Sequence, residues 1–221
     1  MKYPRFIFTF LLTLLLILLL NAKIPFLIST PAGSLPPIGR FVDPFHGFWN
    51  NAEPTKIKSD YLVKIPDIRQ AVTVYYDQQM IPHIFASNNY DLYFSQGYVT
   101  AKDRLWQMEF QTLAAAGRIS EVIGLKGLNY DRLQRRLGMV YGAENSLKAI
   151  MADPVSKEII IAYTAGINAW IAQLKTEDLP LEYKLLDYKP ESWTPLKVSL
   201  LQRSLSKVLT GETEARALTA N

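Results

Sequence analysis

The chain opens with a long uninterrupted apolar segment. Lys2 and Arg5 precede a run from Phe6 to Leu20 in which Thr9 and Thr13 are the only polar residues. Fifteen residues suit the core of a secretory signal and fall short of the roughly 20 that span a bilayer comfortably. The pattern predicts either a cleaved signal peptide over residues 1–22 or a retained N-terminal membrane anchor, because Leu20 stands where a cleavage site prefers a small residue. In both cases we expect an exported body.

Residues 23–64 have no sustained periodicity and are rich in proline and glycine, which predicts an irregular linker. Phe45, His46, Phe48 and Trp49 are candidates for pinning this linker to the body. From residue 65 onward a domain is expected. Alternation of apolar and polar positions predicts strands over 72–76 and 82–86, with Pro82 at a strand entry or an edge.

The remainder of the chain has helical periodicity. Helices are predicted over about 89–116, 131–151 and 154–174, and again from residue 195 until Gly211. Their start signals are Asn88 and the pairs Asp153–Pro154 and Thr194–Pro195, and Gly117 supplies a stop. Val198, Leu201, Leu205 and Val208 form an apolar stripe on the last helix. The pattern therefore predicts an α+β fold that is mostly helical.

Composition excludes several classes of protein. The 221 residues contain no cysteine and two histidines, which excludes thiol nucleophiles and argues against a multi-histidine zinc site built from this chain alone. The net charge of +4 falls to +2 without Lys2 and Arg5, so nucleic-acid binding loses its main support. We interpret Arg132, Arg135 and Arg136 as a solvated helix face. A serine hydrolase elbow is absent from the sequence.

Each of the candidate titratable residues allows a catalytic and a structural interpretation. His83 suits a general base, but a buried imidazole that is hydrogen-bonded to backbone beside aromatic rings is the favoured interpretation. Asp103, Glu109 and Glu121 suit acid and base roles, but carboxylates among arginines in a helix more often form ion pairs that fix packing.

The order of several motifs carries the interpretation further. VTVYYDQQMIPHIFA, YDLYFSQGYVTAKDRLWQMEF, GRISEVIG, AYTAGINAWI and LPLEYKLLDYKPESWTP follow one another along the chain. Together they closely resemble the N-terminal part of the penicillin acylase family, over about Val72 to Arg216. One departure is visible at Gln79–Met80, where the family usually has glycine, and it loosens the expected turn geometry.

The resemblance implies an N-terminal nucleophile amidohydrolase with a four-layer αββα fold. Such an enzyme is made as an exported precursor and cuts itself into a helical α chain and a larger β chain. The nucleophile is the serine at the head of the β chain, and its free α-amine is the base. This chain would be the α-chain portion, so we assign no catalytic residue to it and expect it to be inactive alone.

The resemblance also implies two roles for the α chain. Leu205, Val208 and Leu209 correspond to the wall of the acyl pocket, with ordinary core packing as the competing interpretation. Glu212, or alternatively Glu214, corresponds to a ligand of a structural calcium ion whose remaining ligands come from the β chain; a solvated glutamate is the alternative. The implied substrates are small acylated amides: a β-lactam side chain, an acyl-homoserine lactone or a peptide-like amide.

Two hypotheses follow from the sequence. The first is an α-chain portion that is periplasmic or anchored to the inner membrane, and that hydrolyses an amide only after assembly with a Ser-headed β chain. The second is a truncated, non-catalytic helical module that is tethered to a membrane through its N-terminal segment. The corresponding domain division is 1–22, 23–64 and 65–221, with the last part an incomplete acylase domain.

Overall fold

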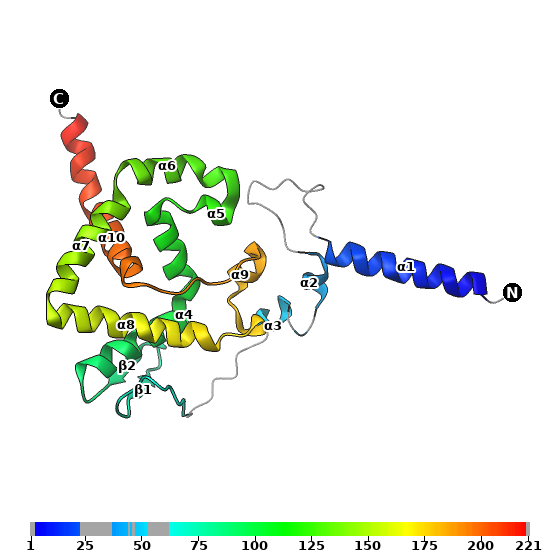
Figure 1. The fold of residues 1–221 in the computed structure, drawn as a ribbon, viewed down its shortest axis with the longest axis horizontal. Coiled ribbons are helices and arrows are strands. Elements are labelled where there is room, and N and C mark those ends of the chain that lie inside the picture. Colours follow the sequence, from blue (N-terminus) through cyan, green and yellow to red (C-terminus); the bar gives the residue numbers. More distant parts are fainter. Residues whose placement is uncertain (1–2, 23–36, 44, 46, 53–61, 220–221) are drawn as a thin grey trace.

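A computed structural model describes residues 3–22, 37–43, 45, 47–52 and 62–219. Helices dominate, and one two-stranded sheet is found among these residues, so the prediction of a mostly helical α+β fold is confirmed (Figure 1). The elements are α1 (Tyr3–Asn21), α2 (Gly39–Val42), α3 (Trp49–Ala52), β1 (Thr73–Tyr76), β2 (Pro82–Phe85), α4 (Asn89–Ala116), α5 (Ser120–Ile123), a 3-10 turn (Gly124–Gly127), α6 (Leu128–Arg136), α7 (Met139–Ala152), α8 (Pro154–Gln173), a second 3-10 turn (Thr176–Asp178), α9 (Leu181–Leu186) and α10 (Pro195–Thr219). The four layers of the αββα fold are not complete within this part of the chain.

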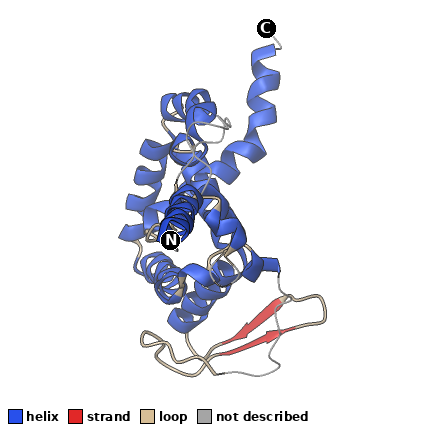
Figure 2. Ribbon diagram, turned by 90° about the vertical axis from the view of Figure 1, so that its right-hand side faces the viewer, coloured by secondary structure: helices blue, strands red, loops and turns tan. Residues whose placement is uncertain are grey.

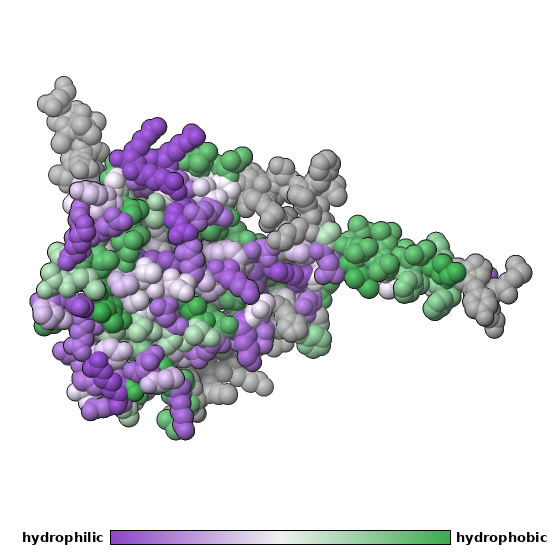
Figure 3. Space-filling model, viewed as in Figure 1, coloured by the Kyte–Doolittle hydropathy of each residue, from purple (hydrophilic) through white to green (hydrophobic). Residues whose placement is uncertain are grey.

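Helix α1 projects from the body as a largely apolar rod (Figures 1 and 3). The last turns of α10 lie on a different side of the body (Figure 1). The large side chains of α1, from Phe6 to Leu19, are all exposed. Within the described ranges, no helix has both the length and the apolar character needed to cross a membrane. The choice between a cleaved signal and an anchor stays a prediction.

The two strands form an antiparallel hairpin at one end of the body (Figure 2). Thr73 pairs with Phe85 and Tyr75 with His83 on the exposed face, while Val74 and Ile84 face inward. The predicted strands are confirmed, and the inward positions follow the alternation of the sequence.

The hairpin turn places an ordinary residue in the left-handed region. Met80 has φ 61°, and its amide donates to the carbonyl of Asp77 over 3.0 Å. The Asp77 carboxylate accepts from the amides of Gln79 and Ile81, which closes the turn. A side chain with a Cβ pays about 1–2 kcal/mol in this conformation, whereas glycine does not. The sequence position that departs from the expected glycine is therefore a strained one.

Replacing Met80 with glycine is expected to stabilise the fold by about 0.5–1 kcal/mol, because relief of the left-handed strain exceeds the added flexibility of the unfolded chain. Met80 is 54% exposed, so little packing is lost. Gln79→Gly is the matched control: its backbone lies outside the left-handed region, and it should be destabilising. Urea unfolding followed by circular dichroism measures both, and equal shifts in the two variants would contradict this interpretation.

Helices α4 and α8 form the centre of the body and carry the predicted caps. The Asn88 side chain accepts from the amide of Asp91 at the start of α4, and Gly117 ends it with φ 68°. Asp153 caps α8 by accepting from the amide of Ser156. The main cluster of buried apolar residues lies between these helices, α9 and the segment that leads to α10: Ala101, Leu105, Met108, Ile167, Leu179, Tyr183 and Trp193.

The predicted helix over 131–151 is wrong in one respect: the chain forms two helices, α6 and α7, which turn apart at Gly138. Gly138 has φ 65°, a conformation that interrupts a right-handed helix and that glycine adopts without strain. The predicted end of the last helix at Gly211 is also wrong, because α10 continues to Thr219. A single glycine lowers helix propensity by only about 1 kcal/mol, so it does not by itself end a helix.

Part of the segment before the domain is docked on the body. Arg40 of α2 forms an ion pair with Asp187, and Asn51 of α3 donates to the carbonyl of Leu179 over 3.1 Å. The ammonium of Lys184 donates to the carbonyl of Gly47 and to the side chain of Asn51. The described residues of this segment, from Arg40 to Asn51, thus hold to α9 and its flanks through polar contacts that span more than a hundred residues of sequence. The predicted linker residue His46 lies outside the described residues.

Candidate functional site

A buried polar cluster fixes the first turn of α10, from Pro195 to Val198, which we call the root of the helix. Glu109 of α4 is 1% exposed, and its carboxylate accepts from the hydroxyl of Tyr183 and from the amide of Glu191, each over 2.6 Å. Lys197, in the first turn of α10, places its ammonium 3.7 Å from Glu109 Oε1 and 3.0 Å from Glu191 Oε2. Arg118 extends the cluster with a 2.6 Å ion pair to Glu191. Two regions far apart in sequence, residues 109–118 and 183–197, therefore meet at this point.

The charges in this cluster shift one another's pKa. Burial raises the pKa of Glu109, and the hydrogen bonds from Tyr183 and from the Glu191 amide and the nearby Lys197 only partly offset it. The Arg118 guanidinium, together with Lys197, outweighs desolvation and lowers the pKa of Glu191 to about 2. Burial and the neighbouring Glu109 carboxylate raise the pKa of Tyr183 far above its usual value. At neutral pH the Tyr183 hydroxyl is accordingly protonated and donates a hydrogen bond to Glu109.

A second contact fixes the segment that leads into α10. The side-chain amide of Asn168 on α8 donates to the carbonyl of Trp193 over 3.0 Å and accepts from the amide of the same residue over 2.7 Å. The Trp193 ring is 2% exposed and belongs to the main core. Both backbone groups of Trp193 are satisfied by a single side chain, so the start of α10 at Pro195 has little freedom.

One face of α10 stays on the body beyond its root. Leu200 is buried against Ala115 of α4 and Ala143 of α7. The guanidinium of Arg203 lies over Gly142, where an added Cβ would come within 2.8 Å of it, and Lys207 donates to Gln134 of α6 over 3.2 Å. Leu200, Arg203 and Lys207 follow one another at steps of three and four residues, so they share one side of α10. We call this side the body face.

The predicted acyl-pocket residues lie on the opposite side of α10. Leu205, Val208 and Leu209 are 61%, 72% and 81% exposed. Glu212 follows Leu205 by seven residues and Val208 by four, so it belongs to the same side of the helix, although its side chain lies outside the described ones. We call this side, Leu205, Val208, Leu209 and Glu212, the free face. The competing interpretation, packing in the core of this chain, does not hold for its three apolar residues, because none of them is buried.

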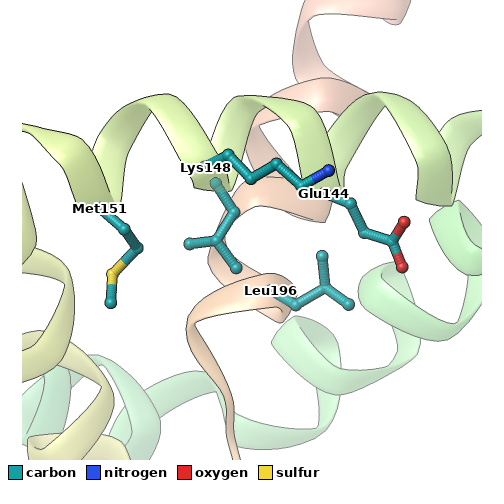
Figure 4. Close-up of a pocket in the computed structure, with 5 residues that line it drawn as sticks. Glu144, Lys148, Met151 and Leu196 are labelled. Atoms are coloured by element: carbon teal, nitrogen blue, oxygen red, sulfur yellow. The ribbon is translucent and has the colours of Figure 1, made fainter.

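A shallow apolar groove lies beside the root of α10. Glu144, Leu147, Lys148 and Met151 of α7 and Leu196 of α10 line a cavity of about 340 Å³ (Figure 4). Its floor is aliphatic, and the charged groups of Glu144 and Lys148 stand at its rim. It lies on the α7 side of α10 and holds no cluster of catalytic groups.

The other titratable candidates do not form a catalytic site. His83 is half-exposed on the outer face of the hairpin, 3.2 Å from Asp77, so the favoured interpretation of a buried imidazole is wrong. Glu121 pairs with Arg118 and Glu109 belongs to the buried cluster, as the ion-pair interpretation expects, while Asp103 is exposed. In the part of the chain with described side chains, no three His, Asp or Glu residues come together as a metal site.

Comparison with known proteins decides the family. The sequence profile of the penicillin amidase family matches residues 71–221, about two thirds of the chain. The chain belongs to the penicillin amidase family. Among curated members, it is 38% identical over 147 residues to the penicillin acylase 2 proenzyme of Pseudomonas sp. (strain SE83), a match that covers 66% of this chain and 18% of the relative. It is 36% identical over 155 residues to acyl-homoserine lactone acylase QuiP of Pseudomonas syringae pv. syringae (strain B728a), covering 68% and 18%.

A solved member of the penicillin amidase family supports the fold. A thermostable penicillin G acylase from Alcaligenes faecalis superposes with a TM-score of 0.60 at 29% identity, over 68% of this chain and 80% of that chain. The chain spans less than a fifth of the length of the curated relatives it matches.

Sequence reasoning missed the partners of Glu109. Tyr183, Glu191 and Lys197 lie more than seventy residues away from it, and no local pattern links them. A faint signal exists within α4 itself. Glu109 follows Leu105 and Met108 at core-facing steps, and a carboxylate at such a position requires buried partners.

Proposed function

We propose that this chain is the α-chain portion of an exported amidohydrolase that cleaves the linear amide of an acylated small molecule. The observation that carries the proposal is the match to the penicillin amidase family along residues 71–221. Relatives named as penicillin acylases and acyl-homoserine lactone acylases favour an acylated amide as the substrate. The name proenzyme of one relative supports a precursor that is processed into chains.

Catalysis in this proposal needs a second chain. A serine at the head of a β chain supplies the nucleophile, and its own α-amine, with a reference pKa of about 7.7–8.0, accepts the hydroxyl proton near neutral pH. Hydrogen-bond donors then stabilise the oxyanion of the tetrahedral intermediate. Two uncovered surfaces of this chain suit such an assembly: the free face of α10 and the outer face of the hairpin, with Tyr75 and Phe85 exposed.

The free face of α10 supplies the acyl pocket in this proposal. Leu205, Val208 and Leu209 offer apolar surface to a hydrophobic acyl group. Glu212 contributes one carboxylate to a structural calcium ion. Carboxylate oxygen suits this hard cation, which takes six to eight oxygen ligands, so most of the site belongs to the β chain. Calcium stabilises the assembly in this proposal and takes no part in the reaction.

The first experiment reconstitutes the enzyme. The chain is produced alone and together with the remainder of its precursor. Release of the amine product is then measured from a phenylacetyl amide, an acyl-homoserine lactone and a β-lactam that carries an acylated side-chain amide. We expect hydrolysis only from the assembled form. Activity of the rigorously purified chain alone would contradict the proposal.

The second candidate function is a non-catalytic module tethered to a membrane by α1, favoured by the exposed apolar side chains from Phe6 to Leu19 of that helix. Circular dichroism and light scattering of the purified chain distinguish the two. A stably folded monomer favours the module. An α-chain portion of an acylase should instead gain structure or solubility only with its β chain, because its exposed apolar surfaces would otherwise remain in water.

Placing a charge on the free face should reduce acylase activity. Val208→Asp is expected to lower kcat/KM of the assembled enzyme by about 10- to 100-fold, because burying a valine side chain contributes about 1.5–3 kcal/mol and a carboxylate forfeits it. Val155→Asp on α8 is the matched control, since Val155 is 62% exposed on another helix. Equal kinetics for the two variants would remove the free face from the acyl pocket.

A further inference from the structure

We propose that Glu109 and Lys197 are positioning residues that set the rotation of α10 about its own axis, and thereby decide which residues form the free face. The inference deepens the proposed function and rests on it only for the role of the free face. The geometry that carries it lies entirely in this chain.

Rotation of α10 about its own axis decides which of its side chains are exposed. Successive residues are turned by about 100°, so a slip of one residue would replace Leu205 and Val208 by Ser206 and Leu209 at the same place in space. Near the start of α10, Leu196 and Leu200 pack on the second core cluster, and Val198 and Leu201 pack against the main core. Hydrophobic contacts are non-directional, so they favour burial of these residues without specifying one rotation as sharply as a charged pair does.

The Glu109 carboxylate can hold α10 against rotation because its own position is fixed. It accepts short hydrogen bonds from Tyr183 on α9 and from the amide of Glu191, and it is almost fully buried. Lys197 is 7% exposed and meets this carboxylate and that of Glu191 from the first turn of α10. Turning α10 by one residue would carry the ammonium away and leave a buried charge without its counter-ion, which is strongly unfavourable.

Two further polar side chains of α10 with described positions lack this property. The guanidinium of Arg203 lies over Gly142 at the end of a flexible side chain, and Lys207 donates to the neutral side-chain amide of Gln134 over 3.2 Å. Both side chains can follow a rotated helix by changing rotamer. The Asn168 contact holds the backbone of Trp193, which precedes α10 and fixes where the helix starts rather than how it is turned.

The test measures where the free face points, independently of activity. The chain has no cysteine, so Asn145→Cys on α7 and Val208→Cys on α10 introduce two unique spin-label sites. Double electron–electron resonance on the full labelled chain should give one narrow distance. Lys197→Met is expected to abolish the single narrow peak in favour of a broad distribution, and Glu109→Gln should do the same. Lys197→Arg, which keeps the charge, should restore the narrow peak.

Leu113→Ala is the control for general destabilisation, because Leu113 is buried in α4 and is not part of the cluster. It should lower the unfolding midpoint and leave the distance unchanged. A narrow, unshifted peak in Lys197→Met would overturn the proposal, as would equal broadening in Leu113→Ala. If Glu109→Gln does not fold, Lys197→Met against Lys197→Arg decides alone. Absence of acylase activity in the assembled enzyme would refute the proposed function and leave this distance result standing.

Discussion

Gly166→Ala is expected to destabilise the protein by about 3 kcal/mol or more, although it adds a single methyl group. A Cβ at this position would lie 1.9 Å from the carbonyl oxygen of Phe94, which belongs to the backbone of α4. The contact is reciprocal, because a Cβ at Gly97 would lie 2.1 Å from the carbonyl oxygen of Tyr163 on α8. Neither helix can yield without moving the core between them.

Gly142→Ala provides the matched control for that prediction. Gly142 also lies inside a helix, but the atoms near its added Cβ belong to the mobile end of Arg203. Alanine has the higher helix propensity at both sites by about 1 kcal/mol, so the difference between the variants isolates the clash. Urea unfolding followed by circular dichroism gives both free energies. Comparable stability of the two variants would show that α4 and α8 do not pack this closely.

Asp91→Asn is expected to lower the free energy of unfolding by about 2–3 kcal/mol at pH 7. The buried carboxylate accepts from the amides of Arg69 and Gln70, each over 2.9 Å, and from the side chain of Asn88 over 2.7 Å. An asparagine retains one acceptor oxygen, so at least one buried donor loses its partner. Asp103→Asn, an exposed change on the same helix, should be nearly neutral.

The loss in Asp91→Asn should depend on pH. Burial alone would raise the pKa of Asp91, but the hydrogen bonds from Arg69, Asn88 and Gln70 outweigh it and hold the pKa below its usual value. A carboxylate with a lowered pKa stabilises the fold above the unfolded value of about 4, and this stabilisation is lost as pH falls through the folded value. The gap between the variant and the original chain should therefore be full at pH 7 and shrink below pH 4. A gap that is constant with pH would contradict a role for the charge.

Local features of the fold were predictable from the sequence because they depend on neighbouring residues. The hairpin strands, the caps at Asn88 and Asp153 and the start of α10 at Pro195 are encoded within a few positions of where they act. The break at Gly138 and the continuation through Gly211 were not predictable in the same way. Glycine permits both a left-handed turn and a helix, and packing decides between them.

The long-range polar contacts could not be predicted from the sequence. The pairing of Glu109 with Tyr183 and of Asn168 with Trp193 depends on the crossing of helices, which no local periodicity specifies. The acyl-pocket positions on α10 were named through the family resemblance. Hydrophobicity alone placed Leu205 and Val208 with Val198 and Leu201 on one apolar stripe, although the first two are exposed and the other two are partly buried.

The docking of residues 37–52 on α9 bears on where the protein can be shortened. Among the described residues, the Lys184 ammonium donates to the Gly47 carbonyl, to the Asn51 side chain and to the carbonyl of Glu177. A gene trimmed to the family match at residue 71 would strip a buried cation of most of its hydrogen bonds. Any shortened version designed for crystallisation should accordingly start upstream of Gly39, even though the family match begins at residue 71.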